Sequence, residues 1–233
     1  MKLFRQIAVG LQQLFYPQLC PGCGTLLQSG EKVICLACVA HLPFTNFHYN
    51  PHNLVASVFA GRLPLEKATS FLFFNKEGLT QQLLHQLKYK GRQDIGVFLG
   101  GLFARELNNE QFLNDIDLIL PVPLHPRKQF KRGFNQSAAV AKGMSEASGI
   151  AYATNAVAKI KHTESQTHKT RSQRIENVAG VFKVNNAALL QNRHLLLVDD
   201  VLTTGATLES CALELLKIAG VRLSVATLSI AVD

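Results

Sequence analysis

The chain has 233 residues, of which 47% are hydrophobic, and it carries 24 lysines and arginines against 16 aspartates and glutamates. This composition excludes a disordered chain, and a chain of this length can bury a core without disulfides. No apolar run approaches the roughly 18 residues of a membrane span, and from the N-terminal residues we expect no secretory leader. We therefore expect a cytoplasmic protein.

The net charge of +8 is concentrated in one part of the chain. Residues 117–194 alone carry a net +8, whereas residues 195–233 carry −3. Clustered cations favour a polyanionic partner, such as nucleic acid, a phosphorylated small molecule or a membrane surface.

Hydrophobic periodicity predicts the elements in chain order. The helices are expected at residues 3–15, 79–88, 95–107, 135–148 and 205–219. The strands are expected at residues 70–74, 117–122, 181–184, 195–198 and 223–230. Residues 124–134 are interpreted as a basic loop, and residues 159–178 as a long polar loop. The alternation of strands and helices after residue 117 predicts an α/β fold with a mostly parallel sheet flanked by helices.

Four of the five cysteines form the pattern Cys-x2-Cys-x11-Cys-x2-Cys, at Cys20, Cys23, Cys35 and Cys38. Two Cys-x-x-Cys pairs can direct four thiolates toward one point, which is the tetrahedral ligand set of structural zinc. Zinc is favoured over disulfides, because nothing else in the sequence indicates an oxidising compartment. This four-cysteine segment, a zinc knuckle, would either stabilise its own fold or present a surface to nucleic acid or protein. Cys211, inside the last predicted helix, is interpreted as a small buried hydrophobic side chain.

Residues 195–207 combine an apolar strand, two carboxylates, a hydroxyl- and glycine-rich turn and the start of a helix. Ligands of open α/β sheets bind at the carboxyl ends of strands, and a helix N-terminus offers N–H groups to an anion. Asp199 and Asp200 can accept hydrogen bonds from two sugar hydroxyls or hold Mg²⁺ through water. Such an Asp pair also occurs in simple metal sites and helix caps. The adjoining turn favours a sugar 5′-phosphate, and it consists of Thr203, Thr204, Gly205, Ala206 and Thr207.

Several short segments, in their order along the chain, carry a family resemblance. They are Leu14-Phe15-Tyr16-Pro17 before the cysteines, Leu87-Lys88-Tyr89-Lys90-Gly91-Arg92, Pro121-Val122-Pro123-Leu124, Arg132-Gly133-Phe134-Asn135-Gln136, Gln166, Arg174 with Asn177-Val178, and residues 195–207. The last segment resembles the phosphoribosyl-pyrophosphate (PRPP) motif of type I phosphoribosyltransferases. The chain, over nearly its whole length, resembles the ComF/GntX family of bacterial competence-associated proteins.

The resemblance implies a type I phosphoribosyltransferase-like domain that binds PRPP with Mg²⁺, preceded by a small zinc knuckle. Asp199 and Asp200 would take the ribose hydroxyls and, indirectly, Mg²⁺, and the turn at 203–207 would take the 5′-phosphate. The loop after the first strand would take the place of the pyrophosphate loop, with the cations Arg127, Lys128, Lys131 and Arg132. The expected divisions are a helix and knuckle at 1–45, a connecting region with packed helices at 46–116, and the main domain at 117–233.

The long polar loop would take the place of the mobile hood that closes over the substrate. Its candidate catalytic residues are Arg171 and Arg174, and it also supplies Lys161 and Lys169. Lys159 and Lys161 stand where the family pattern favours arginine, and lysine lacks the bidentate fork. The two histidines of the loop, His162 and His168, are interpreted as exposed side chains, with acid–base work as the alternative.

Two functions of different classes follow. The first is an enzyme in which a nucleophile of unknown identity attacks the anomeric carbon of PRPP and expels pyrophosphate. The second is a non-catalytic adaptor that retains the PRPP pocket and binds single-stranded DNA or a protein of the DNA-uptake machinery. The aromatic residues Phe130 and Phe134 among the cations fit nucleic-acid binding. The resemblance also implies an association with natural transformation.

Overall fold

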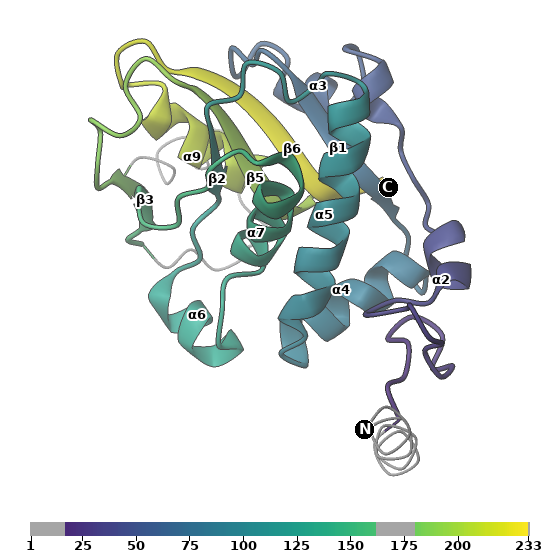
Figure 1. Ribbon diagram of the computed structural model, residues 1–233. Coiled ribbons are helices and arrows are strands. Elements are labelled where there is room, and N and C mark those ends of the chain that lie inside the picture. Colours follow the sequence, from purple (N-terminus) through teal and green to yellow (C-terminus); the bar gives the residue numbers. More distant parts are fainter. Residues whose placement is uncertain (1–16, 162–179, 233) are drawn as a thin grey trace, which may run out of the picture.

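The computed structural model describes residues 17–161 and 180–232 (Figure 1). The helices are α2 (Leu36–Ala40), the short 3-10 helix η1 (Phe47–Tyr49), α3 (Leu54–Phe59), α4 (Leu79–Tyr89), α5 (Gln93–Asn109), α6 (Pro126–Arg132), α7 (Gln136–Ser148) and α9 (Ala206–Leu215). The strands are β1 (Ala68–Phe74), β2 (Leu118–Pro121), β3 (Val157–Lys159), β4 (Phe182–Val184), β5 (His194–Leu202) and β6 (Arg222–Ala231). No helix in the described ranges is long and apolar enough to cross a membrane.

Four strands form one parallel sheet in the order β1-β6-β5-β2. Leu195 of β5 lies opposite Leu118 of β2 and Leu223 of β6, and Ser70 of β1 lies opposite Thr227 of β6. Because all four strands run the same way, their carboxyl ends meet at one edge of the sheet. The predicted α/β fold with a parallel sheet is confirmed.

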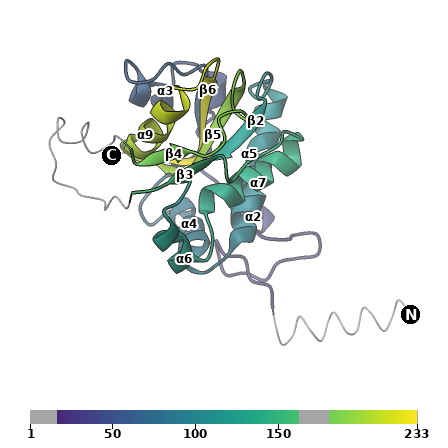
Figure 2. The same cartoon turned by 90° about the vertical axis from the view of Figure 1, so that its left-hand side faces the viewer.

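Helices cover both faces of the sheet, with α3 and α9 on one side and α5 and α7 on the other (Figure 2). The burial of β5 follows from its run of apolar residues, which alternate between the two faces. Leu196 and Val198 belong to the hydrophobic cluster that includes α5 and α7, whereas Leu195 and Leu197 belong to the cluster that includes α9.

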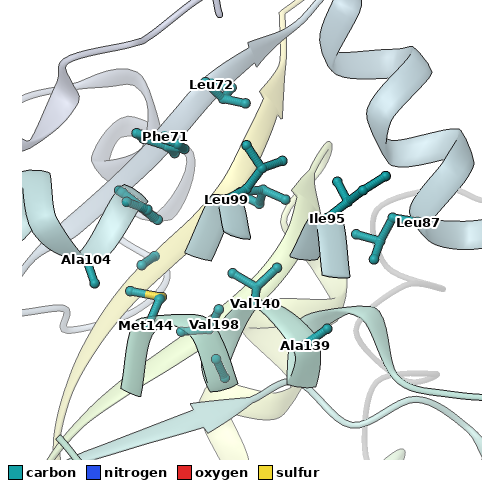
Figure 3. Packing of buried hydrophobic residues seen from close by; sticks show 14 of the residues in the cluster. Phe71, Leu72, Leu87, Ile95, Leu99, Ala104, Ala139, Val140, Met144 and Val198 are labelled. Carbon is teal, nitrogen blue, oxygen red and sulfur yellow. The ribbon is translucent and has the colours of Figure 1, made fainter. Parts of the chain in front are cut away.

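Two glycines allow α5 and α7 to touch backbone to backbone. A Cβ built on Gly100 would lie 2.2 Å from the carbonyl oxygen of Val140, and one on Gly143 would lie 2.0 Å from that of Val97. Figure 3 shows Val140 and Met144 of α7 beneath Leu99 of α5, with Val198 of the sheet beside them. This close approach fixes α7, whose first turn reaches the carboxyl edge of the sheet.

The basic segment expected to be a loop contains the helix α6, and this expectation was wrong. Pro126 occupies the first turn, where its missing N–H costs nothing, and the His125 ring nitrogen accepts a hydrogen bond from the Arg127 N–H at 3.2 Å. Gly133 ends the helix in the left-handed conformation, with φ of 82°. Proline and glycine signals at both ends outweighed the lack of hydrophobic periodicity.

Other elements refine the expected organisation. The strand near residues 181–184 pairs antiparallel with β3 in a separate small sheet, so it is no part of the main one. Strand β1 comes from the segment expected to be connecting and forms an edge of the main sheet.

Part of the predicted organisation lies outside the described residues. It comprises the helix at 3–15 and, within the hood, Gln166, Lys169, Arg171, Arg174, Asn177, Val178 and both histidines, His162 and His168.

Candidate functional site at the carboxyl edge of the sheet

Two consecutive acidic residues, Asp199 and Asp200, stand near the end of β5. Asp199 is half-buried and accepts a hydrogen bond from the Ser137 hydroxyl of α7 at 2.7 Å. The backbone N–H of Asp200 also donates to Asp199 Oδ1, at 2.9 Å. Ser229 of β6 donates to the carbonyl oxygen of Asp200 at 3.2 Å, which ties this part of β5 to the neighbouring strand. The pair is therefore held in place from two elements besides its own.

Cations approach this acid pair from two other elements. Lys88, at the end of α4, forms an ion pair with Asp200, with 3.0 Å between Nζ and Oδ2. Lys159 of β3 lies with its ammonium 5.3 Å from the centre of the Phe182 ring. Burial lowers the pKa of Lys159, the charge of Lys128 lowers it further, and the Asp199 carboxylate partly opposes the shift. These shifts indicate that Lys128, Lys159 and Asp199 share one electrostatic environment.

The pKa of Asp199 is raised to about 7. Burial is the main cause, and the neighbouring charge of Asp200 adds to it. The hydrogen bonds from Ser137 and from the Asp200 N–H, together with the charge of Lys88, oppose the rise without cancelling it. Ionised Asp199 is thus costly in the ligand-free protein, and a cation or hydroxyl donor bound there would lower that cost.

The turn after β5 leads directly into the N-terminus of α9. Thr203, Thr204 and Thr207 are exposed, and no side chain of the described residues caps the helix at Gly205. The free N–H groups of this first turn and the positive end of the helix dipole suit an anion. The predicted hydroxyls and the predicted carboxylates therefore share one edge of the sheet.

Gly205 has φ of 77° and fits closely against α3. A Cβ at this position would lie 2.9 Å from Phe59 Cε1 and 2.9 Å from Val58 Cγ1. Arg62, just beyond α3, forms an ion pair with Glu209 of α9 and donates a hydrogen bond to the carbonyl oxygen of Val58 at 2.9 Å. These contacts fix the shape of the turn at residues 203–207, where the sequence predicts an anion.

The four cations expected in the pyrophosphate loop are carried by α6 and differ in their surroundings. Arg127 and Lys131 are exposed, while Lys128 and Arg132 are half-buried. Arg132 donates a hydrogen bond to Gln136 Oε1 at 2.8 Å, and its guanidinium lies 5.7 Å from the centre of the Tyr89 ring. The charge of Lys128 acts on Lys159, which in turn interacts with Asp199. Arg132 contacts Tyr89 at the end of α4, the helix that carries Lys88.

The four knuckle cysteines come together, as the spacing predicts. Their sulfur atoms all lie within 4.8 Å of one another, and Cys23 and Cys35 are 3.6 Å apart. Sulfurs bound to one tetrahedral Zn²⁺ at about 2.3 Å stand roughly 3.8 Å apart, so the cluster fits that ion. A hydrogen bond with Thr25 lowers the pKa of Cys23 to about 6, whereas burial raises the pKa of Cys38.

The knuckle is packed on the main domain. Cys20, Cys35 and Cys38 are buried in the same hydrophobic cluster as α4, α5 and α7. Gly22 faces Leu79 at the start of α4, where an added Cβ would lie 2.6 Å from Leu79 Cδ1. Cys211, in contrast, is fully buried in the cluster beneath α9, as a small hydrophobic side chain should be.

The sequence did not identify every residue of the strand-edge site, by which we mean the acid pair, its partners Ser137 and Lys88, and the turn at 203–207. Lys88 was noted only within a family segment, and Ser137 had no assigned role, because neither stands near the acid pair in sequence. A position two residues past the Asn135 cap, in the first turn of α7, was the only available signal for Ser137. Phe134 is buried in the core rather than exposed for stacking, while Phe130 is 93% exposed.

Comparison with known proteins relates part of the chain to a described domain family and to curated relatives. Residues 126–232 match the phosphoribosyl transferase domain family. One relative is DNA utilization protein YhgH of Salmonella typhimurium, 32% identical over 138 residues, which are 58% of this chain and 60% of the relative. Another is competence protein F of Haemophilus influenzae, 31% identical over 143 residues, or 58% and 61% of the two chains. The chain thus spans about 60% of the length of these curated relatives.

Among solved structures, the glutamine PRPP amidotransferase of B. subtilis aligns with a TM-score of 0.41 and 18% identity, over 60% of this chain and 30% of that one. A yeast adenine phosphoribosyltransferase aligns with a TM-score of 0.35 and 17% identity, over 60% and 69% of the two chains.

The parallel sheet, the acid pair and the family match define a phosphoribosyltransferase-type domain behind a four-cysteine cluster. Over 58% of its length the chain is also similar to the relatives named competence protein F and DNA utilization protein.

Proposed function

We propose that this chain binds PRPP together with Mg²⁺ at the carboxyl edge of the sheet and transfers its phosphoribosyl group to an acceptor. The observation that carries the proposal is the acid pair of β5, which leads through an exposed threonine turn into the uncapped N-terminus of α9. This arrangement lies within the segment matched to the phosphoribosyl transferase domain.

In this proposal each part of PRPP has a partner of suitable chemistry. Asp199 and Asp200 accept hydrogen bonds from the two ribose hydroxyls. The N–H groups of α9 and the hydroxyls of Thr203, Thr204 and Thr207 bind the 5′-phosphate. Gly205 and Ala206 allow the backbone to approach the phosphate, because neither has a bulky side chain. The carboxylate oxygens suit Mg²⁺, which prefers oxygen ligands and retains water.

The leaving diphosphate lies near the cations of α6. Lys128 and Arg132 are the inner pair, and Arg127 and Lys131 the outer pair. Mg²⁺ bound to the diphosphate supplies charge neutralisation for the departing group. Arg171 and Arg174, outside the described residues, remain the candidate catalytic residues of the hood.

The four cysteines form, in the same proposal, a structural zinc site. Four thiolates are the ligand set of closed, structural zinc sites, so no coordination position would remain for a substrate.

Isothermal titration calorimetry with PRPP and Mg²⁺, together with an assay of pyrophosphate release, tests the enzyme proposal. The double variant Asp199→Asn/Asp200→Asn should bind PRPP at least about tenfold more weakly and release no pyrophosphate, because both diol acceptors are changed. Glu146→Gln, an exposed change at the far end of α7, serves as the matched control and should behave as the wild type. Equal PRPP affinity in the double variant and the control would contradict the proposed site.

A second function is favoured by the surface of α6. Phe130 is 93% exposed and stands between exposed cations, the combination that single-strand-binding surfaces use for stacking and charge. In this reading the protein is an adaptor that binds single-stranded DNA during DNA uptake and retains the PRPP pocket.

Binding of a fluorescent oligothymidylate at several salt concentrations discriminates the two functions. An adaptor that uses α6 should lose affinity in Phe130→Ala, and its salt dependence should become shallower in Arg127→Gln/Lys131→Gln. PRPP binding without turnover, combined with these losses, would favour the adaptor. An unchanged salt dependence would exclude α6 as the DNA site.

A further inference from the structure

Lys88 occupies a place in the acid site that the roles proposed above leave unexplained. It lies at the end of α4, and its ammonium is 3.0 Å from Asp200 Oδ2. Both side chains are largely removed from solvent, with exposures of 21% for Lys88 and 15% for Asp200. The contact is therefore more than a surface ion pair, whose contribution is usually close to zero.

A cation already bound to Asp200 changes what the acid pair can accept. A free divalent ion must displace the ammonium or share the carboxylate with it, against the repulsion between the two positive charges. Displacement also leaves Lys88 without its partner in a partly buried place, which is costly. Mg²⁺ gives up its hydration water reluctantly. A carboxylate already neutralised by lysine therefore contributes little free energy to binding the free ion.

A ligand that brings both charges removes this conflict. When the divalent ion arrives bound to a diphosphate, the ion can neutralise the acid pair while the diphosphate accepts the released ammonium. Lys88 is placed for such an exchange, because the next residue of α4, Tyr89, lies against Arg132 of the basic helix. The end of α4 thus contacts both the acid pair and the candidate diphosphate site.

We propose that Lys88 is the built-in counter-cation of the ligand-free acid pair and passes to the diphosphate on binding, so that the site takes a divalent ion only together with its diphosphate. This inference rests on the proposed PRPP site and adds to it an order of binding and a ligand-binding residue. No covalent bond is made or broken in the exchange.

Mn²⁺ binding, followed by the electron paramagnetic resonance signal of the free ion, tests the exchange in zinc-loaded full-length protein. Without PRPP, Lys88→Met should bind Mn²⁺ about tenfold more tightly than the wild type, since the competing cation is gone. With Mn²⁺ present, the same variant should bind PRPP about tenfold more weakly, since the diphosphate loses a partner. The opposite signs matter, because a merely structural defect would weaken both interactions.

Two further variants complete the test. Lys90→Met removes an exposed charge from the same end of α4 and should match the wild type in both titrations. Lys88→Arg keeps the charge and should restore weak binding of free Mn²⁺.

If Lys88→Met, with an unchanged circular dichroism spectrum, binds free Mn²⁺ no more tightly than the wild type, the exchange is wrong even where PRPP binds well. If the wild type fails to bind PRPP at all, the proposed function fails and the exchange fails with it.

Discussion

The four-cysteine knuckle and the strand-edge site each bring acidic side chains together, but the negative charge of each cluster is balanced in a different way. The knuckle gathers four thiols from residues 20–38, and their charges as thiolates call for an external dication. The strand edge gathers two carboxylates, and there the protein supplies a cation of its own through Lys88. With the proposed zinc, one cluster would depend on a bound ion for its stability, whereas the other is neutralised in part by a lysine of the protein itself.

The two regions also differ in how they are assembled. The knuckle ligands lie on one short segment, so its geometry is local. The strand-edge site draws Lys88 from α4, Ser137 from α7 and Asp199 from β5, so it exists only when the helices are packed on the sheet in register. Changes at the knuckle should thus act through the metal, and changes at the edge through packing and charge.

Removing one knuckle thiol should have the largest effect. Cys20→Ser takes away a buried ligand that belongs to the main hydrophobic cluster. We expect the bound zinc to fall from about one ion per chain to almost none, and the free energy of unfolding to fall by about 3 kcal/mol or more. Metal analysis and chemical denaturation measure both. Cys211→Ala is the control, and this variant should retain its zinc because Cys211 lies outside the cluster. A wild-type protein without zinc would contradict the metal proposal.

Breaking the helix contact that fixes α7 should come next. Gly143→Ala places a methyl group against the Val97 carbonyl oxygen, which forces α5 and α7 apart. A loss of roughly 2–4 kcal/mol in unfolding free energy is expected, with weaker PRPP binding because Ser137 moves with α7. Gly101→Ala is the matched control, because its Cβ would meet only the Gly143 carbonyl oxygen at 3.6 Å. Equal stability of the two variants would show that the close approach is unimportant.

A pair of glycines with the same backbone conformation compares the two regions directly. Gly205 at the strand edge has φ of 77° and Gly24 in the knuckle has φ of 74°. Gly24→Ala should cost only the strain of the left-handed conformation, about 1 kcal/mol, because nothing lies within 4 Å of the added Cβ. Gly205→Ala should cost about 2–3 kcal/mol, since the crowding by Val58 and Phe59 is added. Thermal denaturation that ranks the two variants in reverse order would contradict this.

The smallest effect concerns the pH dependence of stability. The pKa of Asp199 is about 7 in the folded protein, well above the ordinary value of 3.8. Between these values the unfolded chain has released the proton while the folded protein still holds it, so this group makes the fold less stable as pH rises from about 4 to 7. Asp199→Asn removes the titration and keeps an acceptor for Ser137.

Urea denaturation in Mg²⁺-free buffer at pH 4.5 and 7.5 measures this contribution. The stability of the Asp199→Asn variant relative to the wild type should be greater by roughly 1–2 kcal/mol at the higher pH, a value reduced for the partial exposure of the site. Glu146→Gln should show no such trend. A difference between variant and wild type that stays flat with pH would rule out the raised pKa.

Local patterns predicted most of the fold. At the strand-edge site they predicted the acid pair and the turn, but not the residues that approach from α4 and α7. The cysteine spacing predicted the knuckle. The strand, acid pair and turn of residues 195–207 also lie in the expected order. Both features depend on residues that are close together in the sequence. Lys88 could not be placed from the sequence, since its approach to Asp200 depends on how α4 lies across the end of the sheet. β1 was predicted as a strand, but its parallel pairing with β6 joins residues more than 150 positions apart and has no local signature.

Helix α4 joins the two regions that the cysteines and the carboxylates define. Leu79, its first residue, packs on Gly22 of the knuckle, and Lys88, near its last turn, holds Asp200. Eleven helical residues form a rod about 16 Å long. If the proposed exchange displaces this rod, the displacement would act on the four cysteines, and the affinities of the two proposed sites would be thermodynamically linked. By reciprocity, any factor by which PRPP changed the affinity for zinc would equal the factor by which zinc changed the affinity for PRPP.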